Sequence, residues 1–347
     1  MNVLFIGLGG IGQRHLRNLV SLKLSDLHIY AYRVRKASFV LGDKLLIEEG
    51  KNLEEQYSIK VFDTLDEAWE HSIDVAFICN PTSLHRETLL QVMRHVRGIF
   101  IEKPIAEGME GLAEIADWCK RNNVVTFIGY QNRFHPCIEK AKKLLSEKMI
   151  GRVISVNAEI GEDVRKWHKY EDYRQMYACR KDLGGGVVLS QIHELDYIPY
   201  LLSEIPETVY AIGGKLSDLE IDVEDVASIV MKFNVCGEVI PVHLYEDYIQ
   251  YPPSRCCKII GTRGRIEFDL LNAEIVCYGE DGDVVFSNKY DFSRNDMFLK
   301  EMDIFLNAVL HREASNIDIY EGMKSLRIAE AVKASLATGK VVRIQEG

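Results

Sequence analysis

The sequence lacks the features that would place the protein in a membrane or on nucleic acid. No apolar run approaches the ~20 residues that a membrane-spanning helix needs. The first apolar run, at 3–6, leads straight into glycines, so no signal peptide is expected. The chain has 42 Lys and Arg against 52 Asp and Glu, and the net charge of −10 argues against nucleic-acid binding. We therefore predict a cytoplasmic protein that binds neither membranes nor nucleic acid.

Metal-binding cysteine pairs are also missing. The eight cysteines, at positions 79, 119, 137, 179, 236, 256, 257 and 277, include no C-x-x-C pair. We predict that all eight are reduced thiols and that there is no structural zinc site. His168 and Asp172 have the i, i+4 spacing of a metal-binding pair, but the sequence offers no evident third ligand. We therefore predict no metal.

What the sequence does contain is a glycine pattern near its start. Gly7, Gly9 and Gly12 form G-x-G-x-x-G between a short apolar run and helix-forming sequence. The first glycine allows a sharp turn, the second leaves room for a pyrophosphate, and the third lets the helix pack closely on the strand. The free N–H groups at the start of such a helix attract phosphate. We predict a dinucleotide-binding turn that includes Gly10 and Ile11.

The second predicted strand, at 27–32, ends without the acidic residue that usually holds the adenosine ribose. That residue stands about 20 positions after the last glycine. At and after this position the chain has Tyr32, Arg33, Arg35 and Lys36. Arginine attracts a 2′-phosphate that a carboxylate would repel, so we favour NADP over NAD, with Tyr32 and Arg33 as ligands. The alternative is that the basic residues are solvated and backbone groups hold NAD.

Strand-like and helix-like segments alternate through residues 1–128. Buried-type strands are predicted at 74–79, 98–101 and 124–128, and the polar stretch from the second strand to Gly50 is predicted to be helical. This alternation favours an α/β Rossmann domain, a doubly wound parallel sheet that binds a dinucleotide.

From residue 129 the pattern changes. Consecutive strand-like segments with turn signals between 207 and 290 predict a largely antiparallel sheet. A glycine turn at 184–186 precedes a predicted helix at 187–202. We therefore predict an α+β domain over 129–347.

Several motifs follow one another along the chain in a fixed order. After the first glycine turn they are Asn80-Pro81-Thr82 with His85, Glu102-Lys103-Pro104-Ile105-Ala106, Gly129-Tyr130-Gln131-Asn132-Arg133-Phe134, and Gly184-Gly185-Gly186 with His193 and Asp196. In combination they resemble the glucose–fructose oxidoreductase / inositol dehydrogenase family (Gfo/Idh/MocA) over essentially the whole chain. The resemblance implies hydride transfer between a nicotinamide and a secondary alcohol or ketone of a sugar, sugar acid or nucleotide sugar. It also implies a homo-oligomer, a dimer or tetramer, formed through the open sheet of the second domain.

The resemblance places Lys103 at the reaction centre. The residue follows a buried-type strand, where a partly desolvated amine has a lowered pKa and can hold or polarise the reacting oxygen. Pro104 favours an extended backbone that aims this side chain into the crevice. The alternative is a structural lysine paired with Glu102.

His193 is the second predicted catalytic residue. On one helix, Ser190, His193 and Asp196 would share a face, so that Ser190 or Asp196 would orient the imidazole for acid–base chemistry. The alternative is a core histidine. Many family members have Asp four residues after the last glycine and His four residues later, whereas Ser190 and the nearer His193 stand here.

The remaining contacts are predicted from the same motifs. The predicted cofactor contacts are Asn80, Pro81, Thr82, His85, Glu102, Lys103 and Asn132. Aromatic faces stack on sugar rings and arginine binds carboxylates bidentately. The substrate candidates are therefore Arg133, Trp167, His168, Tyr173, Arg174 and Arg180, with Ser190 and Asp196. The arginines between 165 and 180 favour an acidic sugar.

Three functions remain open at this point. The first is an NADP-dependent oxidoreductase. The second is a glycoside-cleaving enzyme of the same fold, which oxidises its substrate transiently and regenerates its cofactor. The third is a non-catalytic NADP-binding regulatory protein, against which Lys103 and His193 argue.

Overall fold

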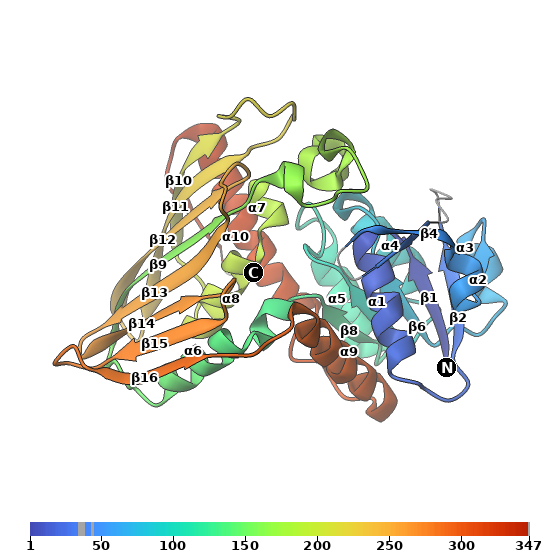
Figure 1. The fold of residues 1–347 in the computed structure, drawn as a ribbon, viewed down its shortest axis with the longest axis horizontal. Coiled ribbons are helices and arrows are strands. Elements are labelled where there is room, and N and C mark those ends of the chain that lie inside the picture. The colour runs from blue at the N-terminus through green and yellow to red at the C-terminus, as the bar shows by residue number, and fades with distance from the viewer. Residues whose placement is uncertain (34–38, 43–44, 346–347) are drawn as a thin grey trace.

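The structure is a computed structural model that describes residues 1–33, 39–42 and 45–345. Two sheets lie side by side, each with its own helices, and two long helices near the C-terminus run between them (Figure 1). Within the described ranges, we find no helix with the length and apolar character to cross a membrane.

The first sheet is parallel and has six strands in the order β5-β2-β1-β6-β7-β8. The bounds are β1 (Asn2–Ile6), β2 (His28–Tyr32), β5 (Lys60–Phe62), β6 (Val75–Ile78), β7 (Gly98–Ile101) and β8 (Val125–Ile128). Strands β6, β7 and β8 are buried along their full length, as expected of a sheet covered by helices on both faces. The predicted α/β Rossmann fold is confirmed.

The helices of this half are short apart from the first. They are α1 (Gly10–Ser21), α2 (Leu53–Tyr57), α3 (Leu65–Trp69), α4 (His85–Val92) and α5 (Leu112–Arg121). The helix predicted before Gly50 is wrong for the residues described there. They form a hairpin of β3 (Phe39–Leu41) and β4 (Ile47–Asn52), which the side chain of Gln13 joins to α1 by hydrogen bonds to the Phe39 carbonyl and the Leu41 amide.

The second sheet has nine strands in the order β16-β15-β14-β13-β9-β12-β11-β10-β17. The bounds are β9 (Val153–Gly161), β10 (Thr208–Gly214), β11 (Val226–Val235), β12 (Glu238–Asp247), β13 (Ser254–Gly261), β14 (Gly264–Asp269), β15 (Glu274–Tyr278), β16 (Val284–Lys289) and β17 (Val342–Arg343). All pairs are antiparallel except β9 with β12. The predicted largely antiparallel sheet is confirmed.

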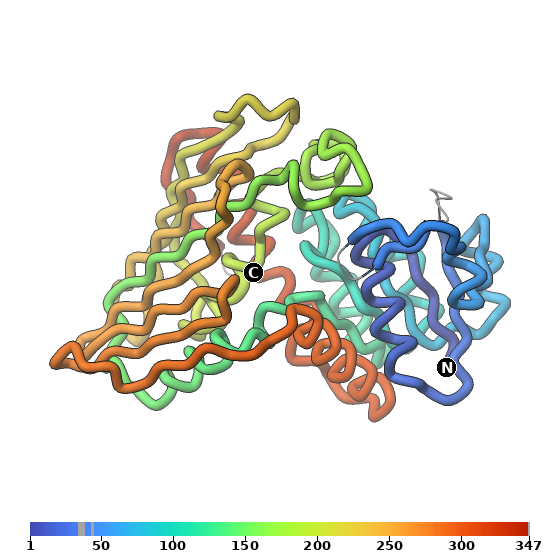
Figure 2. Tube along the Cα trace, viewed as in Figure 1, coloured from blue at the N-terminus to red at the C-terminus, as the bar shows by residue number. Residues whose placement is uncertain are grey.

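Helices cover one face of this sheet and leave the other open (Figures 1 and 2). The covering helices are α6 (Pro136–Ser146), α7 (Val187–Ser190), α8 (His193–Leu202) and α10 (Ile319–Thr338). On the strands, buried residues alternate with exposed ones. The open face therefore carries Ile212, Val230 and Val239, each roughly half exposed or more.

The prediction of a single helix at 187–202 is wrong, because the helix is interrupted between α7 and α8. Gln191 leaves the helical region (φ −98°, ψ 24°), and its side chain donates to the Asp247 carbonyl of β12. Ser190 therefore lies on a different helix from His193 and Asp196.

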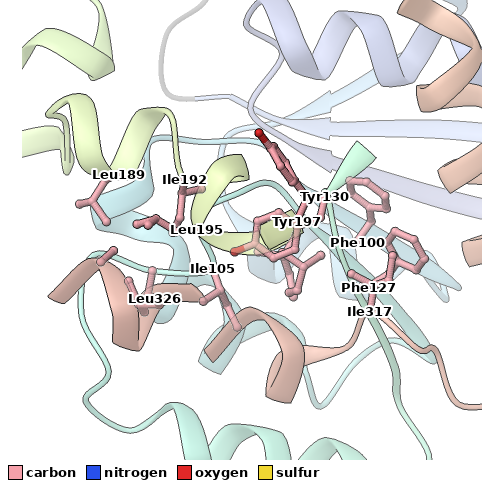
Figure 3. Packing of buried hydrophobic residues seen from close by; sticks show 14 of the residues in the cluster. Phe100, Ile105, Phe127, Tyr130, Leu189, Ile192, Leu195, Tyr197, Ile317 and Leu326 are labelled. Atoms are coloured by element: carbon pink, nitrogen blue, oxygen red, sulfur yellow. The ribbon is translucent and has the colours of Figure 1, made fainter. Parts of the chain in front are cut away.

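The last long helices join the two halves. Helix α9 (Arg294–His311) packs against α1 and β8, and the ring of Phe305 lies 5.6 Å from Phe100 and 6.0 Å from Phe127 in the first sheet. Figure 3 shows the apolar cluster between the halves, where the same two phenylalanines lie in one group with Tyr130 and with Tyr197 of α8. The division at residues 128 and 129 stays a prediction.

Candidate active site

The first glycine turn has the geometry that a pyrophosphate requires. Gly7 has φ +93°, and a Cβ there would lie 2.8 Å from the backbone of Cys79 and Asn80. A Cβ on Gly12 would collide with the Gly7 carbonyl, whereas one on Gly9 would meet no atom within 4 Å. Close packing thus requires two of the glycines, and the third leaves open space at the start of α1, where free N–H groups favour an anion. The residues fit a dinucleotide.

At the predicted ribose end of this site, a positively charged arginine lies beside a negatively charged glutamate. Arg33 is 5% exposed, its Nη1 donates to Glu54 Oε1 at 3.0 Å, and burial lowers its pKa. Tyr32 is half-buried and its carbonyl accepts from the Gly7 amide at 3.2 Å. Arg35 and Lys36 lie outside the described residues. Any 2′-phosphate on Arg33 would meet the Glu54 carboxylate.

The loop after β6 is held against the loop after β7 by His85. The imidazole lies between two carbonyls, with Nδ1 2.8 Å from Pro104 O and Nε2 2.9 Å from Asn80 O. The Asn80 side chain donates to Thr88, and Thr82 faces Gly184 of the second domain, where a Cβ would lie 3.0 Å away. These predicted cofactor residues line the end of the parallel sheet where ligands of such folds bind.

Lys103 bridges from the end of β7 to the second domain. Its Nζ donates to the Ser190 carbonyl at 2.6 Å, and burial lowers its pKa to about 8, against the raising effect of Glu102. Glu102 is engaged elsewhere, because its Oε1 accepts from His15 at 2.6 Å. Lys103 is therefore a partly buried amine that can change protonation near neutral pH.

His193 lies at the start of α8 and is neutral. Burial lowers its pKa well below the usual value, and the positive charges of Lys103 and two arginines act in the same direction. Its Nε2 lies 3.0 Å from Gln131 Nε2, and its Nδ1 has no hydrogen-bond partner among the described residues. Gln131, from the 3-10 turn η2 (Gln131–Phe134), therefore orients the imidazole.

Asp196 pairs with Arg133 and not with the His193 imidazole that it was predicted to orient. Its carboxylate accepts two hydrogen bonds from Arg133, at 2.9 and 2.6 Å, and Arg133 also pairs with Glu321 at 3.0 Å. This buried network joins η2, α8 and α10. Arg133 and Asp196 thus satisfy each other and hold the segment that presents Gln131, and neither needs a substrate to balance its charge.

The arginine-rich segment between β9 and α7 is neutralised locally. Each arginine pairs with an aspartate two residues away, in the pairs Arg165–Asp163, Arg174–Asp172 and Arg180–Asp182, and Arg174 also binds Glu220. The two predicted aromatic substrate residues also have partners within the protein: the Tyr173 hydroxyl accepts from the Glu220 amide, and Trp167 packs edge-on against Tyr248 at 5.3 Å. Asn132, a predicted cofactor contact in η2, is buried. None of these contacts directs the arginines toward Lys103.

Two arginines that sequence reasoning missed act on the site instead. Arg255 of β13 donates to Glu194 at 2.8 and 2.7 Å, and Glu194, the residue after His193, is fully buried. Arg294 begins α9, is exposed, and forms no ion pair within the part of the chain that the structure describes. Both lower the pKa of Lys103. A glutamate buried on a helix requires a cation nearby, but the position of Glu194 in the sequence does not identify Arg255 as that cation.

A metal centre finds no support in the described ranges. There, no group of three His, Cys, Asp or Glu side chains could hold an ion. His168 pairs with Glu171 at 2.7 Å rather than with Asp172.

Comparison with known proteins gives the family. Residues 1–130 match the model described as "Oxidoreductase family, NAD-binding Rossmann fold" (GFO_IDH_MocA), and residues 138–267 match the corresponding C-terminal domain. A 2,7-anhydro-N-acetylneuraminate hydratase of Escherichia coli strain K12 is 30% identical over 49% of this chain and 45% of its own length. The chain thus matches about half the length of this curated relative. Myo-inositol 2-dehydrogenase of Thermotoga maritima is 26% identical over 100% of the chain and 99% of its own.

Solved structures agree with the fold. A levoglucosan dehydrogenase in complex with NADH superposes with a TM-score of 0.83 at 18% identity, covering 100% of both chains. At this identity the likeness establishes the fold alone.

Proposed function

We propose, since the chain belongs to the Gfo/Idh/MocA oxidoreductase family, that it is an NAD(P)-dependent dehydrogenase or reductase acting on a CH–OH group of a sugar, sugar acid or nucleotide sugar. The observation that carries the proposal is Lys103, a partly buried amine with a pKa of about 8 that donates to the Ser190 carbonyl between the two domains. Lys103 and His193 are the proposed catalytic residues.

The proposed mechanism assigns the proton to Lys103. The nicotinamide, when bound, supplies or accepts the hydride. In oxidation the neutral amine takes the hydroxyl proton, and in reduction the ammonium returns it to the carbonyl oxygen. Neutral His193 accepts from Gln131 at Nε2, so its proton lies on Nδ1, which can donate a hydrogen bond to the same oxygen without adding charge.

For the substrate we propose an acidic sugar. The arginines between 165 and 180 are paired with carboxylates and do not support this proposal. Arg294 supports it, because its positive charge lowers the pKa of both Lys103 and His193. An arginine is suited to a carboxylate near the reacting carbon. The Escherichia coli relative is named for an anhydro-N-acetylneuraminate, which is also an acidic sugar.

For the cofactor we propose NADP, with NAD as the alternative, and the proposal rests on Arg33. Its guanidinium pairs with Glu54, so a 2′-phosphate has to compete with this carboxylate. One relative, from Haloferax volcanii, is named an NADP(+)-dependent D-xylose 1-dehydrogenase, whereas the levoglucosan dehydrogenase structure holds NADH.

A second candidate function is transient oxidation with regeneration of the cofactor, as in glycoside cleavage. It is favoured by the relative that is named a hydratase. Such an enzyme would convert its substrate with no net change in NAD(P)H absorbance. A regulatory protein would instead bind the cofactor and leave every sugar unchanged.

The test is turnover of acidic and neutral sugars with NADPH and NADH, read both as absorbance and as product. Wild-type protein is compared with Lys103→Met, and Lys143→Met on the exposed side of α6 is the matched control. Loss of turnover in the first variant alone supports the proposal. Binding of cofactor without conversion of any sugar would contradict it.

We further propose a homo-oligomer, a dimer or tetramer, that forms through the open sheet face. Ile212, Val230 and Val239 on that face are apolar and exposed, and such surfaces favour association. Cytoplasmic location stays a prediction.

A further inference from the structure

We propose that residues 163–183 of the second domain close the cofactor phosphate site and that Tyr170 is a ligand of the pyrophosphate. The inference rests on the proposed dinucleotide binding and adds a residue that the motifs did not predict. The segment runs as an irregular arch from the second sheet to the first domain (Figure 1, light green).

The carrying observation is the place of the Tyr170 hydroxyl. A Cβ on Gly10 would lie 2.8 Å from it, and the Gly10 backbone is close enough to act on the pKa of the hydroxyl in the lowering direction. Gly10 is the first residue of α1, which has no acidic residue in its first turn and no side-chain cap. The Tyr170 hydroxyl thus lies against the helix end whose free N–H groups a dinucleotide phosphate uses.

Two residues, His168 and Phe39, hold the ring in this position. It stacks on His168 at 5.0 Å and 19°, and its hydroxyl lies 3.2 Å from His168 Nδ1. Phe39 of the β3–β4 hairpin contacts the ring at 5.9 Å. His168 is in turn fixed by Glu171 at 2.7 Å, so the hydroxyl is positioned before any ligand arrives.

The residue that follows the arch, Gly184, also contacts the first domain. Gly184, at φ +76°, leaves no room for a side chain, because a Cβ would lie 3.0 Å from Thr82 and 3.1 Å from the Ser83 amide. The second-domain segment therefore touches both loops that bracket the cofactor crevice, the one after β1 and the one after β6. Cofactor binding and the substrate-domain segment are coupled through these two contacts.

The chemistry requires an exchange of hydrogen bonds. A tyrosine hydroxyl both accepts and donates. The Tyr170 hydroxyl now faces His168 Nδ1 at 3.2 Å and the Glu171 carboxylate, and when a phosphate oxygen takes the Gly10 N–H, the hydroxyl donates to the phosphate instead of to these groups. Charge-assisted bonds of this kind are the stronger ones, so Tyr170 adds to cofactor affinity from across the domain boundary.

The test measures binding rather than turnover. ADP-ribose, which has the pyrophosphate but no nicotinamide, is titrated by calorimetry into wild-type protein, Tyr170→Phe, and the surface control Tyr251→Phe. We expect Tyr170→Phe to weaken binding about tenfold and the control to match wild type. Adenosine, which lacks phosphate, should bind Tyr170→Phe and wild type equally.

A second measurement needs no variant. Hydrogen exchange of wild-type peptides covering 163–183 should slow with ADP-ribose and remain unchanged with adenosine. Unchanged ADP-ribose affinity in Tyr170→Phe would overturn the inference, and tighter binding would show that the tyrosine obstructs the site. If wild-type protein bound no ADP-ribose at all, the proposed function itself would fail, which is a different result.

Discussion

The two sides of the crevice differ in how their charges are arranged. On the first-domain side, the glycine turn leaves its helix N-terminus without acidic residues. On the second-domain side, the arginines between 165 and 180 each have a carboxylate two residues away. A short glycine motif therefore indicates its ligand directly, whereas a run of arginines indicates one only when its partners are known. Arg294 also has an aspartate two positions away, Asp296, but the Asp296 carboxylate accepts from the Ser293 amide and no ion pair of Arg294 is found among the described residues, so Arg294 is the better candidate for an anion.

The largest expected effect is at Lys103. Lys103→Met should lower hydride transfer by about a thousandfold, because it removes the proton-transferring group. Cofactor affinity, measured by fluorescence titration, should stay within a factor of about two, since the glycine turn is untouched. A variant that kept wild-type turnover would remove Lys103 from the mechanism.

The next effect separates the two groups of arginines. Arg294→Met should raise KM for an acidic sugar about thirtyfold and leave a neutral analogue unchanged, because a hydrogen bond to a charged group is lost. Arg174→Gln, whose guanidinium already binds Asp172 and Glu220, should change KM by less than about twofold. The opposite ranking, measured by steady-state kinetics, would restore the arginine-rich segment as the substrate site.

The pH dependence follows from the lowered pKa of Lys103. With a pKa of about 8, the ammonium needed for reduction is present below pH 8 and lost above it, so reduction should fall about tenfold per pH unit beyond that point. Oxidation should rise as the amine becomes neutral. His193 is neutral throughout. Rate profiles in both directions check this, and profiles without a step near pH 8 would contradict it.

The smallest effect concerns cofactor choice. Glu54→Gln removes the carboxylate that pairs with Arg33 and should tighten NADPH binding about fivefold, with NADH unchanged. Parallel fluorescence titrations measure this. Equal changes for both cofactors would mean that Arg33 does not contact a 2′-phosphate, and NADP would no longer be favoured.

The sequence predicted what depends on local order and missed what depends on distant contacts. Apolar runs such as 98–101 and alternation in the second sheet were sufficient for both folds. The helix break at Gln191 depends on a hydrogen bond to Asp247, which lies on another strand. Three further contacts likewise require segments far apart in sequence to meet. They are the hydrogen bonds of Gln131 with His193 and of Arg133 with Asp196, and the contact of Tyr170 with Gly10. The motifs therefore predict a candidate site but not its hydrogen-bond network.

The most direct test of the central claim is transfer of the carbinol hydrogen. An acidic sugar deuterated at its carbinol carbons is incubated with the protein and oxidised cofactor, and the cofactor is analysed by mass spectrometry. We predict deuterium in the reduced nicotinamide with wild-type protein and about a thousandfold less with Lys103→Met. Transient oxidation would return the deuteride to the product and leave the cofactor unlabelled, so the sugar is analysed for conversion in the same samples. Unlabelled cofactor together with unconverted sugar, under conditions where both bind, would contradict the assignment of hydride transfer to this protein.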